Sequence, residues 1–382
     1  RMNSTEIGSF DVPFAGAMQR LKLVEVKVAA SSGKNNRQQR GEIRQLLLCH
    51  PLFSSGGLGR VYLDDPSDQP FSSDATKYAL FCAAICEAIH LQLISQPDVL
   101  HLHDWHSALI PVLSQYVERY QSLKSCRNVY TVHNLSMQGI RPFKDFESSL
   151  EAWFPALSYD GQVICDPRFP HCFNPMRAAI NLCDKIHLVS PSYVAEVLHS
   201  SDSERGFFGG EGLEQDLNNA QQQKRLVGIL NGCNYHSNSA RQVSFMSFLL
   251  QAKLELQQWM AESLQLKSVH YLASQRINSL LQQQPFAGPL VTSVGRLTDQ
   301  KVMLLRQKSG DTTVLGQLLS KLAKIDGFMV LIGSGDKSIE LEFMQMMSQR
   351  DNFIFLNGYG KQIGEDLYQI GDLFLMPSSY EP

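Results

Sequence analysis

Two cations that follow an apolar run are the strongest chemical signal in the chain. The segment Val294-Gly-Arg-Leu-Thr-Asp-Gln-Lys301 places Arg296 and Lys301 five residues apart, directly after a run with the pattern of a strand. Arg296 can bind phosphate oxygens through two parallel hydrogen bonds, and Lys301 adds a mobile point charge. Such a pair alone would ordinarily be two solvated surface cations. Because ligands bind at the carboxyl ends of strands in open α/β sheets, we predict instead that it holds a leaving diphosphate.

Other polar side chains also stand where strand-like runs end. One such residue is ordinary, because the chain leaves the core there, but a set that includes His, Asp, Arg and Glu indicates a site. The set comprises Asp104, His133, Ser190, Asn231, Arg296, Gly333–Asp336, Tyr359 and Ser378–Glu381. We therefore expect residues from distant parts of the chain to meet at sheet edges.

A cluster of histidines raises the question of a metal site. The segment His101-Leu-His-Asp-Trp-His106 has two histidines at alternate positions of a strand-like run, and His106 could complete a zinc site. No second cluster rich in His or Cys supplies further ligands, and short motifs of this kind often match by chance. We expect no metal and no other cofactor, and we expect His101 and His103 to pack within a sheet.

The elements that would position these residues are short runs rich in Val, Ile and Leu. Continuous hydrophobicity is typical of strands covered on both faces, and hence of parallel sheets. After Asp104, apolar residues recur from Leu109 to Tyr120 with a period of about 3.6 residues, which predicts a helix. The predicted strands are 99–104, 128–133, 185–190, 226–231, 289–295, 328–333, 352–358 and 372–377. Strand, helix, strand in repetition predicts an α/β fold.

Length and composition are those of a globular protein with more than one domain. At 382 residues the chain exceeds what one hydrophobic core usually holds. Its 34 Lys and Arg residues against 37 Asp and Glu residues give a net charge of −3, which disfavours a dedicated nucleic-acid-binding protein. The longest apolar run, 78–86, is too short to span a bilayer, and the eight scattered cysteines indicate reduced thiols. We expect a cytoplasmic protein without nucleic-acid or membrane partners.

A Gln- and Leu-rich stretch separates two groups of predicted strands. From about residue 235 the alternation of strand and helix is interrupted, and the pattern predicts a helix over 245–266. We therefore expect a Rossmann-like domain over 1–234, a helical connection over 235–286 and a second Rossmann-like domain over 287–382. Because the chain begins with Arg1 and stops at Pro382 directly after a predicted strand, we expect it to be part of a longer protein.

Several longer motifs resemble, in their order along the chain, those of the bacterial glycogen synthases and plant starch synthases. They are His-Leu-His-Asp-Trp-His at 101–106, Tyr-Thr-Val-His-Asn-Leu at 130–135 with Gln138-Gly139, Gly-Glu-Gly-Leu at 210–213, Gly-Ile-Leu-Asn-Gly at 228–232, Gly-Arg-Leu-Thr-Asp-Gln-Lys at 295–301 and Pro-Ser-Ser-Tyr-Glu-Pro at 377–382. The resemblance implies two Rossmann-like domains facing a cleft, the GT-B glycosyltransferase architecture. It also implies that this chain lacks the first strand with its Lys-x-Gly-Gly loop and the Cys-Gly continuation after Pro382, so that both domains are incomplete.

The same resemblance implies a retaining glucosyltransferase that moves glucose from ADP-glucose to the non-reducing end of an α-1,4-glucan such as glycogen. By matching position, His133 would lie beside the transferred glucose, Asp104 would line the acceptor side and Asn231 would contact the sugar. Retention by two displacements needs a nucleophilic carboxylate under the sugar, and the sequence identifies none. Front-face transfer, in which the leaving phosphate helps to deprotonate the acceptor hydroxyl, is what the resemblance favours.

The second domain carries most of the residues that the resemblance assigns to the donor. Arg296 and Lys301 would hold the diphosphate, and Glu381 would contact the glucose. Tyr359 matches a position expected to stack on the adenine. Tyr62, in the first domain, matches one near the sugar.

Two other functions stay open from the residues alone. The absence of both glycine-rich loops of the family would suit a catalytically impaired relic that binds glucan or nucleotide. The residues that oppose a relic are Asp104, His133, Arg296, Lys301 and Glu381, since a decayed site would have no reason to keep them all. A sugar-nucleotide transferase of another type on the same fold is disfavoured by the Asp-Trp-His and His-Asn-Leu segments. The sequence does not predict an oligomeric state.

Overall fold

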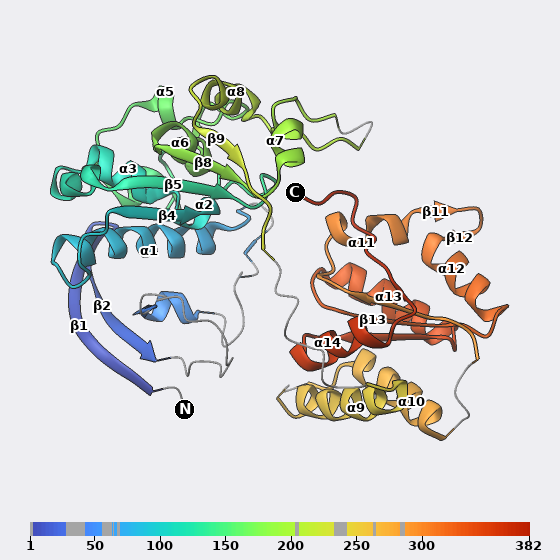
Figure 1. The fold of residues 1–382 in the computed structure, drawn as a ribbon. Helices are drawn as coiled ribbons and strands as arrows, with labels where there is room; N and C mark the ends of the chain where they lie inside the picture. Colours follow the sequence, from blue (N-terminus) through green and yellow to red (C-terminus); the bar gives the residue numbers. More distant parts are fainter. Residues whose placement is uncertain are drawn as a thin grey trace, which may run out of the picture. The chain divides into compact units, whose positions relative to one another are not determined.

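Two four-stranded parallel sheets organise the chain into two α/β units (Figure 1). The computed structural model describes residues 3–27, 43–55, 63, 65–66, 69–202, 206–232, 243–262, 265–282 and 287–382. One unit comprises Arg1–Gly232 with Pro382, and the other comprises Cys233–Glu381. The parallel sheets confirm the α/β fold that the continuous apolar runs predicted.

The parallel sheet of the first unit has the strand order β4-β5-β8-β9. Its strands are β4 (Val99–His103), β5 (Arg127–Val132), β8 (Lys185–Leu188) and β9 (Leu226–Gly228). The helices around it are α1 (Ser72–His90), α2 (Asp104–Ser107), α3 (Leu109–Tyr116), α4 (Leu150–Trp153), α5 (Gly161–Ile164), α6 (Pro175–Leu182), α7 (Pro191–Val197) and α8 (Glu214–Gln222), with 3-10 segments at Pro51–Ser54 and Glu118–Ser125 and a small hairpin of β6 (Arg141–Pro142) and β7 (Cys172–Phe173). All four strands run parallel, so their carboxyl ends share one edge.

The predicted helix from Leu109 to Tyr120 is too long. Helix α3 ends at Tyr116 because Val117 is extended, with φ −98° and ψ 115°, and a 3-10 segment follows. Tyr120 is nonetheless buried, and its hydroxyl donates to the Glu87 carboxylate at 2.9 Å. The apolar period thus correctly predicted that Tyr120 is buried, but it wrongly predicted an α-helical backbone at that position.

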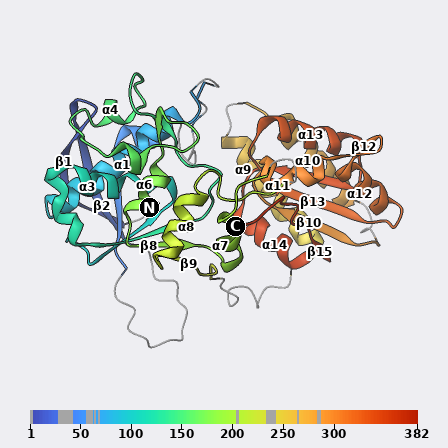
Figure 2. The ribbon, with the colours of Figure 1, turned by 90° about the horizontal axis from the view of Figure 1, so that it is seen from above.

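An antiparallel sheet at the amino terminus is not among the predicted elements. It consists of β1 (Asn3–Phe14), β2 (Ala17–Lys27) and β3 (Gln45–Cys49), and it packs against α1 (Figures 1 and 2). The two residues between β1 and β2, Ala15 and Gly16, have φ values of 52° and 72°, as the tight turn of a hairpin requires. The buried side chains of the hairpin join the hydrophobic core of the first unit.

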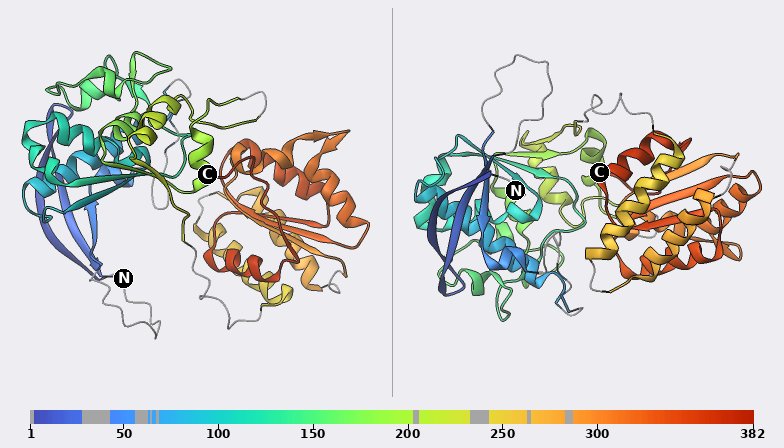
Figure 3. Two further views of the ribbon diagram at one scale, coloured as in Figure 1. Left: turned by 45° about the horizontal axis from the view of Figure 1, so that its top comes forward. Right: turned by 90° about the horizontal axis from the view of Figure 1, so that it is seen from below.

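The second unit is built around a sheet with the order β14-β13-β10-β15. Its strands are β10 (Leu290–Val294), β13 (Phe328–Gly333), β14 (Phe353–Asn357) and β15 (Leu373–Phe374), and its other elements are α11 (Asp299–Arg306), α12 (Val314–Ala323), α13 (Lys337–Gln349), α14 (Lys361–Ile370) and the hairpin β11 (Lys308–Ser309) and β12 (Thr312–Thr313). Helices cover both faces of this sheet (Figure 3). Burial on both faces explains the continuous apolar sequence of β13 and β14, which are buried along their whole length.

The Gln-rich stretch forms two helices of the second unit. Helix α9 (Phe245–Glu262) packs against α14, and α10 (Ser268–Gln282) packs against β14. Phe248 and Leu249 are fully buried in the core of this unit. The helix predicted over 245–266 is present as α9, which ends at Glu262, and a second helix that was not predicted follows it. Within the described ranges, no helix combines the length and the apolar character needed to cross a membrane.

Candidate active site

Asp104 and His133 meet at the carboxyl edge of the first sheet. Asp104 is the first residue of α2, directly after β4, and has a left-handed backbone with φ 49°. Its Oδ1 accepts the backbone N–H of His133 at 2.8 Å, just beyond β5. A positive φ is costly for a residue other than glycine and persists only where the surroundings impose it. The turn after β4 is thus shaped so that the carboxylate holds the end of β5.

The ring of His133 is held by a second residue of the same turn. Nε2 of His133 lies 3.0 Å from Nδ1 of His103, and the two rings are stacked with centroids 5.3 Å apart. Burial, together with the neighbouring rings of His101 and His133, lowers the pKa of His103 below its ordinary value. A neutral His103 can share one hydrogen with His133, so the pair is a hydrogen bond and not a repulsive contact.

A row of side chains crosses the sheet beside this pair. Nε2 of His101 lies 2.7 Å from Oγ1 of Thr131, which lies 2.9 Å from Nδ1 of His187. Nε2 of His187 lies 3.1 Å from the carbonyl oxygen of Ile229, beyond β9. We call this row, from His101 to the Ile229 carbonyl, the histidine ladder.

The histidine ladder and the contact between His103 and His133 correct the expectation that His101 and His103 pack within the sheet. Both side chains are exposed and act through hydrogen bonds. Sequence reasoning missed Thr131 and His187. The signal was weak, because a Thr and a His in two predicted strands lie beside each other on one face only if those strands are neighbours in the sheet.

Asn231 lies near the end of the first unit's chain. It is exposed and stands two residues beyond Ile229, whose N–H donates to the carbonyl of Leu188 at 3.0 Å. The structure thus brings Asn231 to the same sheet edge as Asp104 and His133, at the opposite side of the sheet order. Tyr62, predicted near the sugar, lies outside the described residues.

Gln138 connects two of the motifs quoted above, and every hydrogen-bond donor and acceptor of its side-chain amide has a partner. Its Nε2 donates to the carbonyls of Leu135 and Glu211, both at 3.0 Å. Its Oε1 accepts from Asn174 at 2.6 Å and from Arg168 at 3.2 Å. A buried amide with all these bonds fixes the Gly-Glu-Gly loop to the segment after His133.

In the second unit, Lys301 and Glu381 form a direct ion pair. Nζ of Lys301 donates to both carboxylate oxygens of Glu381, at 2.5 and 2.6 Å. The segment that carries Glu381 is tied to the start of α11, because the N–H and Oγ of Ser379 both donate to the carbonyl of Gln300, at 2.8 and 3.1 Å. Two residues predicted for different parts of one donor molecule are therefore in contact with each other.

The electrostatics of this pair are set by several neighbours. Burial by itself raises the pKa of the Glu381 carboxyl, but hydrogen bonds from Lys301 and Ser378 and the charge of Arg296 outweigh it and hold the pKa below its ordinary value. Glu381 is therefore a carboxylate at neutral pH. Arg296 is exposed and makes no hydrogen bond to another described residue, which leaves its guanidinium available for a ligand.

Two hollows lie next to each other at the carboxyl edge of the second sheet, and Arg296 lines both. The smaller, of about 110 Å³, is also lined by Lys301 and Glu381. The larger, of about 490 Å³, is also lined by Tyr359 and Tyr368. Tyr359 is 79% exposed, so its ring is open to a ligand. The segment before it is fixed, because the ring of Trp259 lies against Gly358 so closely that a Cβ there would be 2.7 Å from it.

Two members of the polar set have structural roles. Oγ of Ser190 accepts the N–H of Tyr193 at 3.0 Å and caps α7. Oδ1 of Asp336 accepts the N–H of Ser338 at 2.7 Å and caps α13. These are ordinary helix starts, for which Ser and Asp are favoured residues.

Among the described residues, no group of three or more His, Cys, Asp or Glu side chains could hold a metal ion. His106, which could have completed a site with His101 and His103, lies instead against the rings of Tyr78 and Trp105, at 4.5 and 4.6 Å between centroids.

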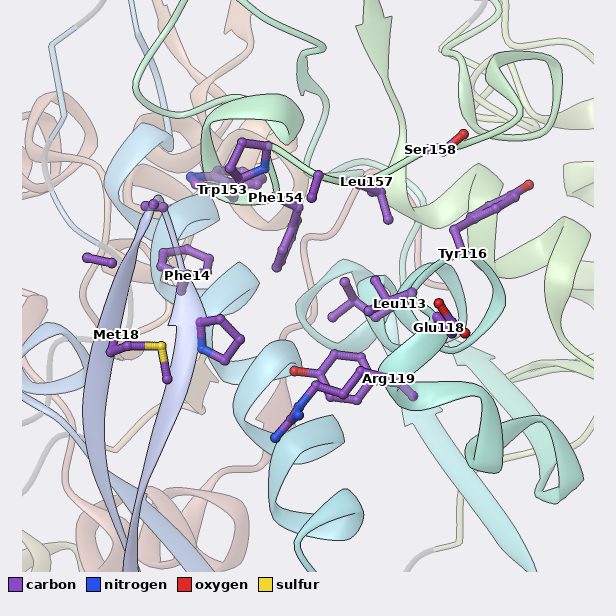
Figure 4. Close-up of a pocket in the computed structure, with 18 residues that line it drawn as sticks. Phe14, Met18, Leu113, Tyr116, Glu118, Arg119, Trp153, Phe154, Leu157 and Ser158 are labelled. Carbon is purple, nitrogen blue, oxygen red and sulfur yellow. The ribbon is translucent and has the colours of Figure 1, made fainter.

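A cavity of about 830 Å³ lies elsewhere in the first unit (Figure 4). Its lining is mostly apolar and includes Phe14, Met18, Leu113, Trp153, Phe154 and Leu157. One wall is the end of α3 and the 3-10 segment that leads into β5, so the cavity lies toward the amino ends of the strands. Arg119, on its rim, is already bound by Glu87 through two hydrogen bonds, at 2.9 and 2.6 Å. None of the predicted site residues lines this cavity.

Comparison with known proteins relates the chain to one family. The sequence profile described as "Starch synthase catalytic domain" matches residues 4–219. The glycogen synthase of Clostridioides difficile is 28% identical over 316 residues, covering 82% of this chain and 58% of that protein. The glycogen synthase of Bacillus cereus strain B4264 is 30% identical over 321 residues, covering 81% of this chain and 58% of that protein. The chain thus spans somewhat less than three fifths of the length of these relatives.

A solved structure has the same architecture. The catalytic domain of starch synthase IV from Arabidopsis thaliana, bound to ADP and acarbose, superposes with a TM-score of 0.67 and 23% identity, covering 100% of this chain and 69% of that chain. This likeness confirms two Rossmann-like units with the architecture of the GT-B glycosyltransferases.

Proposed function

The chain belongs to the starch synthase catalytic domain family, and we propose that it acts as a retaining glucosyltransferase. In the proposed reaction, glucose passes from ADP-glucose to the non-reducing end of an α-1,4-glucan. The relatives named glycogen synthase support this reaction. The Arabidopsis structure supports the ligand classes, because that protein is bound to ADP and acarbose.

The observation that carries the proposal is the position of Arg296 between two hollows. The larger hollow, with the exposed ring of Tyr359, has the size and the aromatic wall for a nucleoside. The smaller hollow holds a cation and a carboxylate, Lys301 and Glu381. A nucleotide sugar has the same order of parts, with a diphosphate between a nucleoside and a sugar. We place the diphosphate at Arg296.

The charge that develops during transfer decides the role of the two cations. When the bond between C1 of glucose and the β-phosphate oxygen breaks, its electron pair goes to the phosphate, and the 4-hydroxyl of the acceptor attacks C1 from the same face. The proton of that hydroxyl passes to the departing phosphate, which leaves as ADP. Arg296 and Lys301 stabilise this negative charge because they are already in place when it forms.

Donor binding changes the partners of Lys301. In the structure its ammonium is paired with the Glu381 carboxylate at 2.5 Å. A diphosphate brings stronger negative charge and competes for the same ammonium. The Glu381 carboxylate is then released to accept hydrogen bonds from glucose hydroxyls, the role that matching position gives it.

Three residues of the first unit are proposed to act on the sugars. His133, held by Asp104 and His103, is proposed to contact the transferred glucose, and Asn231 to bind a sugar hydroxyl. Asp104 is proposed to line the acceptor side.

The activity is tested by incubating the full-length protein with radiolabelled ADP-glucose or UDP-glucose and glycogen. We expect label to enter glycogen from ADP-glucose, with retention at the anomeric carbon. If ADP binds but neither donor is used, the protein is a binding relic. If label reaches only a small sugar acceptor, it is a transferase of another type.

Chelation provides a separate prediction. Since two cations serve the diphosphate, we propose that transfer needs no metal, and incubation with EDTA should leave the rate unchanged. Loss of activity in EDTA that a divalent ion restores would contradict this and would point back to the histidines at 101–106.

A further inference from the structure

We infer that the histidine ladder is a positioning device that sets the place of Asn231. Its members, His101, Thr131 and His187, join β4, β5 and β8 to the segment beyond β9. The ladder touches no reacting atom in the proposed reaction. The role of Asn231 as a sugar contact rests on the proposed function; the ladder itself rests on geometry.

With both imidazoles neutral, as the measurement below sets them at pH 8, the hydrogen bonds of the ladder have only one consistent direction. The Ile229 carbonyl can only accept, so Nε2 of His187 carries a hydrogen. In a neutral imidazole the other nitrogen then accepts, so the Thr131 hydroxyl donates to Nδ1 of His187. Its single hydrogen is thereby used, and the Thr131 oxygen accepts from Nε2 of His101. Both histidines are therefore the tautomer with hydrogen on Nε2.

Because Thr131 is buried, losing either hydrogen bond of its hydroxyl would leave a polar atom without a partner. Its side chain is 1% exposed, so water cannot replace a lost partner of the hydroxyl. A buried polar atom without a partner is costly, whereas the outer histidine can turn toward solvent. Thr131 is thus the link on which the order of the ladder depends.

The ladder ends at the last fixed point before Asn231. Both backbone groups of Ile229 are bonded to β8, the N–H to Leu188 and the carbonyl to His187. Just before it, Gly228 passes so close to Ser190 that a Cβ would lie 2.6 Å from the Ser190 carbonyl oxygen, so β9 cannot shift toward α7. Beyond it, the exposed residues 230–232 make no hydrogen bond to another described residue. We therefore infer that the fixed backbone of Ile229 sets the position of Asn231, two residues further on.

The tautomers can be measured directly. Long-range ¹H–¹⁵N correlation spectra of ¹⁵N-histidine-labelled protein at pH 8, assigned with His101→Gln and His187→Gln variants, report which ring nitrogen carries hydrogen. We expect Nε2–H for both residues. A hydrogen on Nδ1 of neutral His187 would overturn the inference, because the ring would then turn a lone pair toward the carbonyl.

A double-mutant cycle tests whether the ladder acts through Asn231. Thr131→Val keeps the shape of the side chain but removes the hydroxyl, and it should lower kcat/KM for the donor about fivefold, as expected for one lost buried hydrogen bond. Thr131→Ser restores the hydroxyl and should recover most of this loss. In an Asn231→Ala background, Thr131→Val should have no further effect, because the contact that the ladder positions is gone.

The control is Ser114→Ala, which removes another buried hydroxyl of the first unit, one that donates to Pro111 at 3.1 Å within α3. Its effect should be confined to the free energy of unfolding.

If Thr131→Val and Asn231→Ala lower kcat/KM additively, the ladder is merely structural and the inference fails. If Thr131→Val does not fold, Thr131→Ser and the tautomer spectra decide. An inactive wild-type protein with both Nε2–H tautomers would refute the proposed function and leave the ladder standing.

Discussion

The carboxyl edges of the two sheets carry different kinds of side chain. The edge of the first sheet is ordered by hydrogen bonds between strands, among them the one that the Asp104 carboxylate accepts from the N–H of His133 and the one between the stacked rings of His103 and His133. The edge of the second sheet is lined by full charges, Arg296, Lys301 and Glu381. A sugar needs many weak, directional contacts, whereas a departing diphosphate needs charge. The comparison predicts that losses of charge at the second edge affect the rate most and that losses of geometry at the first edge affect it less.

Removing the Lys301 ammonium should have the largest effect. In the full-length protein, Lys301→Ala should lower kcat about a hundredfold to a thousandfold, corresponding to about 3 kcal/mol of lost transition-state stabilisation, while KM for the donor changes far less. The reason is that the β-phosphate gains a further negative charge as the glycosidic bond breaks, so its attraction to Lys301 is stronger in the transition state than in the bound donor. Steady-state kinetics with ADP-glucose and glycogen measure both parameters.

Two further substitutions make this prediction specific. Lys301→Arg should recover only part of kcat, because the planar guanidinium cannot occupy the place of the ammonium. Lys321→Ala, which removes an exposed lysine from α12, should change kcat by less than about twofold, as is usual for surface substitutions. A near-normal kcat in Lys301→Ala would remove Lys301 from the chemistry and with it the contrast between the two edges.

Asp104 tests the geometry of the first edge. Asp104→Ala loses the bond to the N–H of His133 and places Ala at φ 49°, so it should lower the free energy of unfolding by about 1–3 kcal/mol. Asp104→Asn keeps an acceptor oxygen and tolerates the left-handed backbone, and should cost much less stability. Urea denaturation of the variants compares them. Equal losses in both would show that the Asp104 charge, and not its geometry, orders the first edge.

The titration of Glu381 tests how the second edge is neutralised. Because the pKa of Glu381 is lowered in the folded state, the pair with Lys301 is complete above the ordinary pKa of a glutamic acid and is lost as pH falls through the folded value. Lys301→Ala should raise the pKa of Glu381, since burial remains and one hydrogen-bond donor is gone. ¹³C NMR titration of the carboxyl measures the shift. An unchanged pKa would mean that Arg296 and Ser378 alone hold the carboxylate.

The parts of the fold and site that sequence reasoning found are those governed by local rules. All eight predicted strands are present, because a buried parallel strand leaves a continuous apolar run. Asp104 and His133 were predicted to share an edge because each ends such a run. Their contact, through a carboxylate and a backbone N–H, follows from that placement.

The parts that were missed depend on contacts between distant residues or on weak local signals. The pairing of Lys301 with Glu381 depends on the tie of Ser379 to Gln300, about which neither segment carries information by itself. His187 is a single polar residue in a short strand, and only the strand order places it opposite Thr131. The hairpin of β1 and β2 turns at Ala15-Gly16, which lacks the Asn-Gly or Asp-Gly signature of such turns.

The cavity of about 830 Å³ gives the smallest expected effect and the most general test of the comparison. If transfer depends only on the two carboxyl edges, filling a cavity at the amino side of the first sheet should not matter. Ala156→Phe introduces a large side chain at its exposed rim and should change kcat/KM and the Kd of ADP by less than about twofold. Ser334→Phe, a similar change at the exposed rim of the hollow near Tyr359, should instead weaken ADP binding, because the ring occupies space that the nucleoside needs. Isothermal titration calorimetry with ADP and steady-state kinetics compare the two variants. If Ala156→Phe impaired transfer as strongly as Ser334→Phe, the apolar cavity would be coupled to the chemistry. The division into a hydrogen-bonded first edge and a charged second edge would then no longer account for the site.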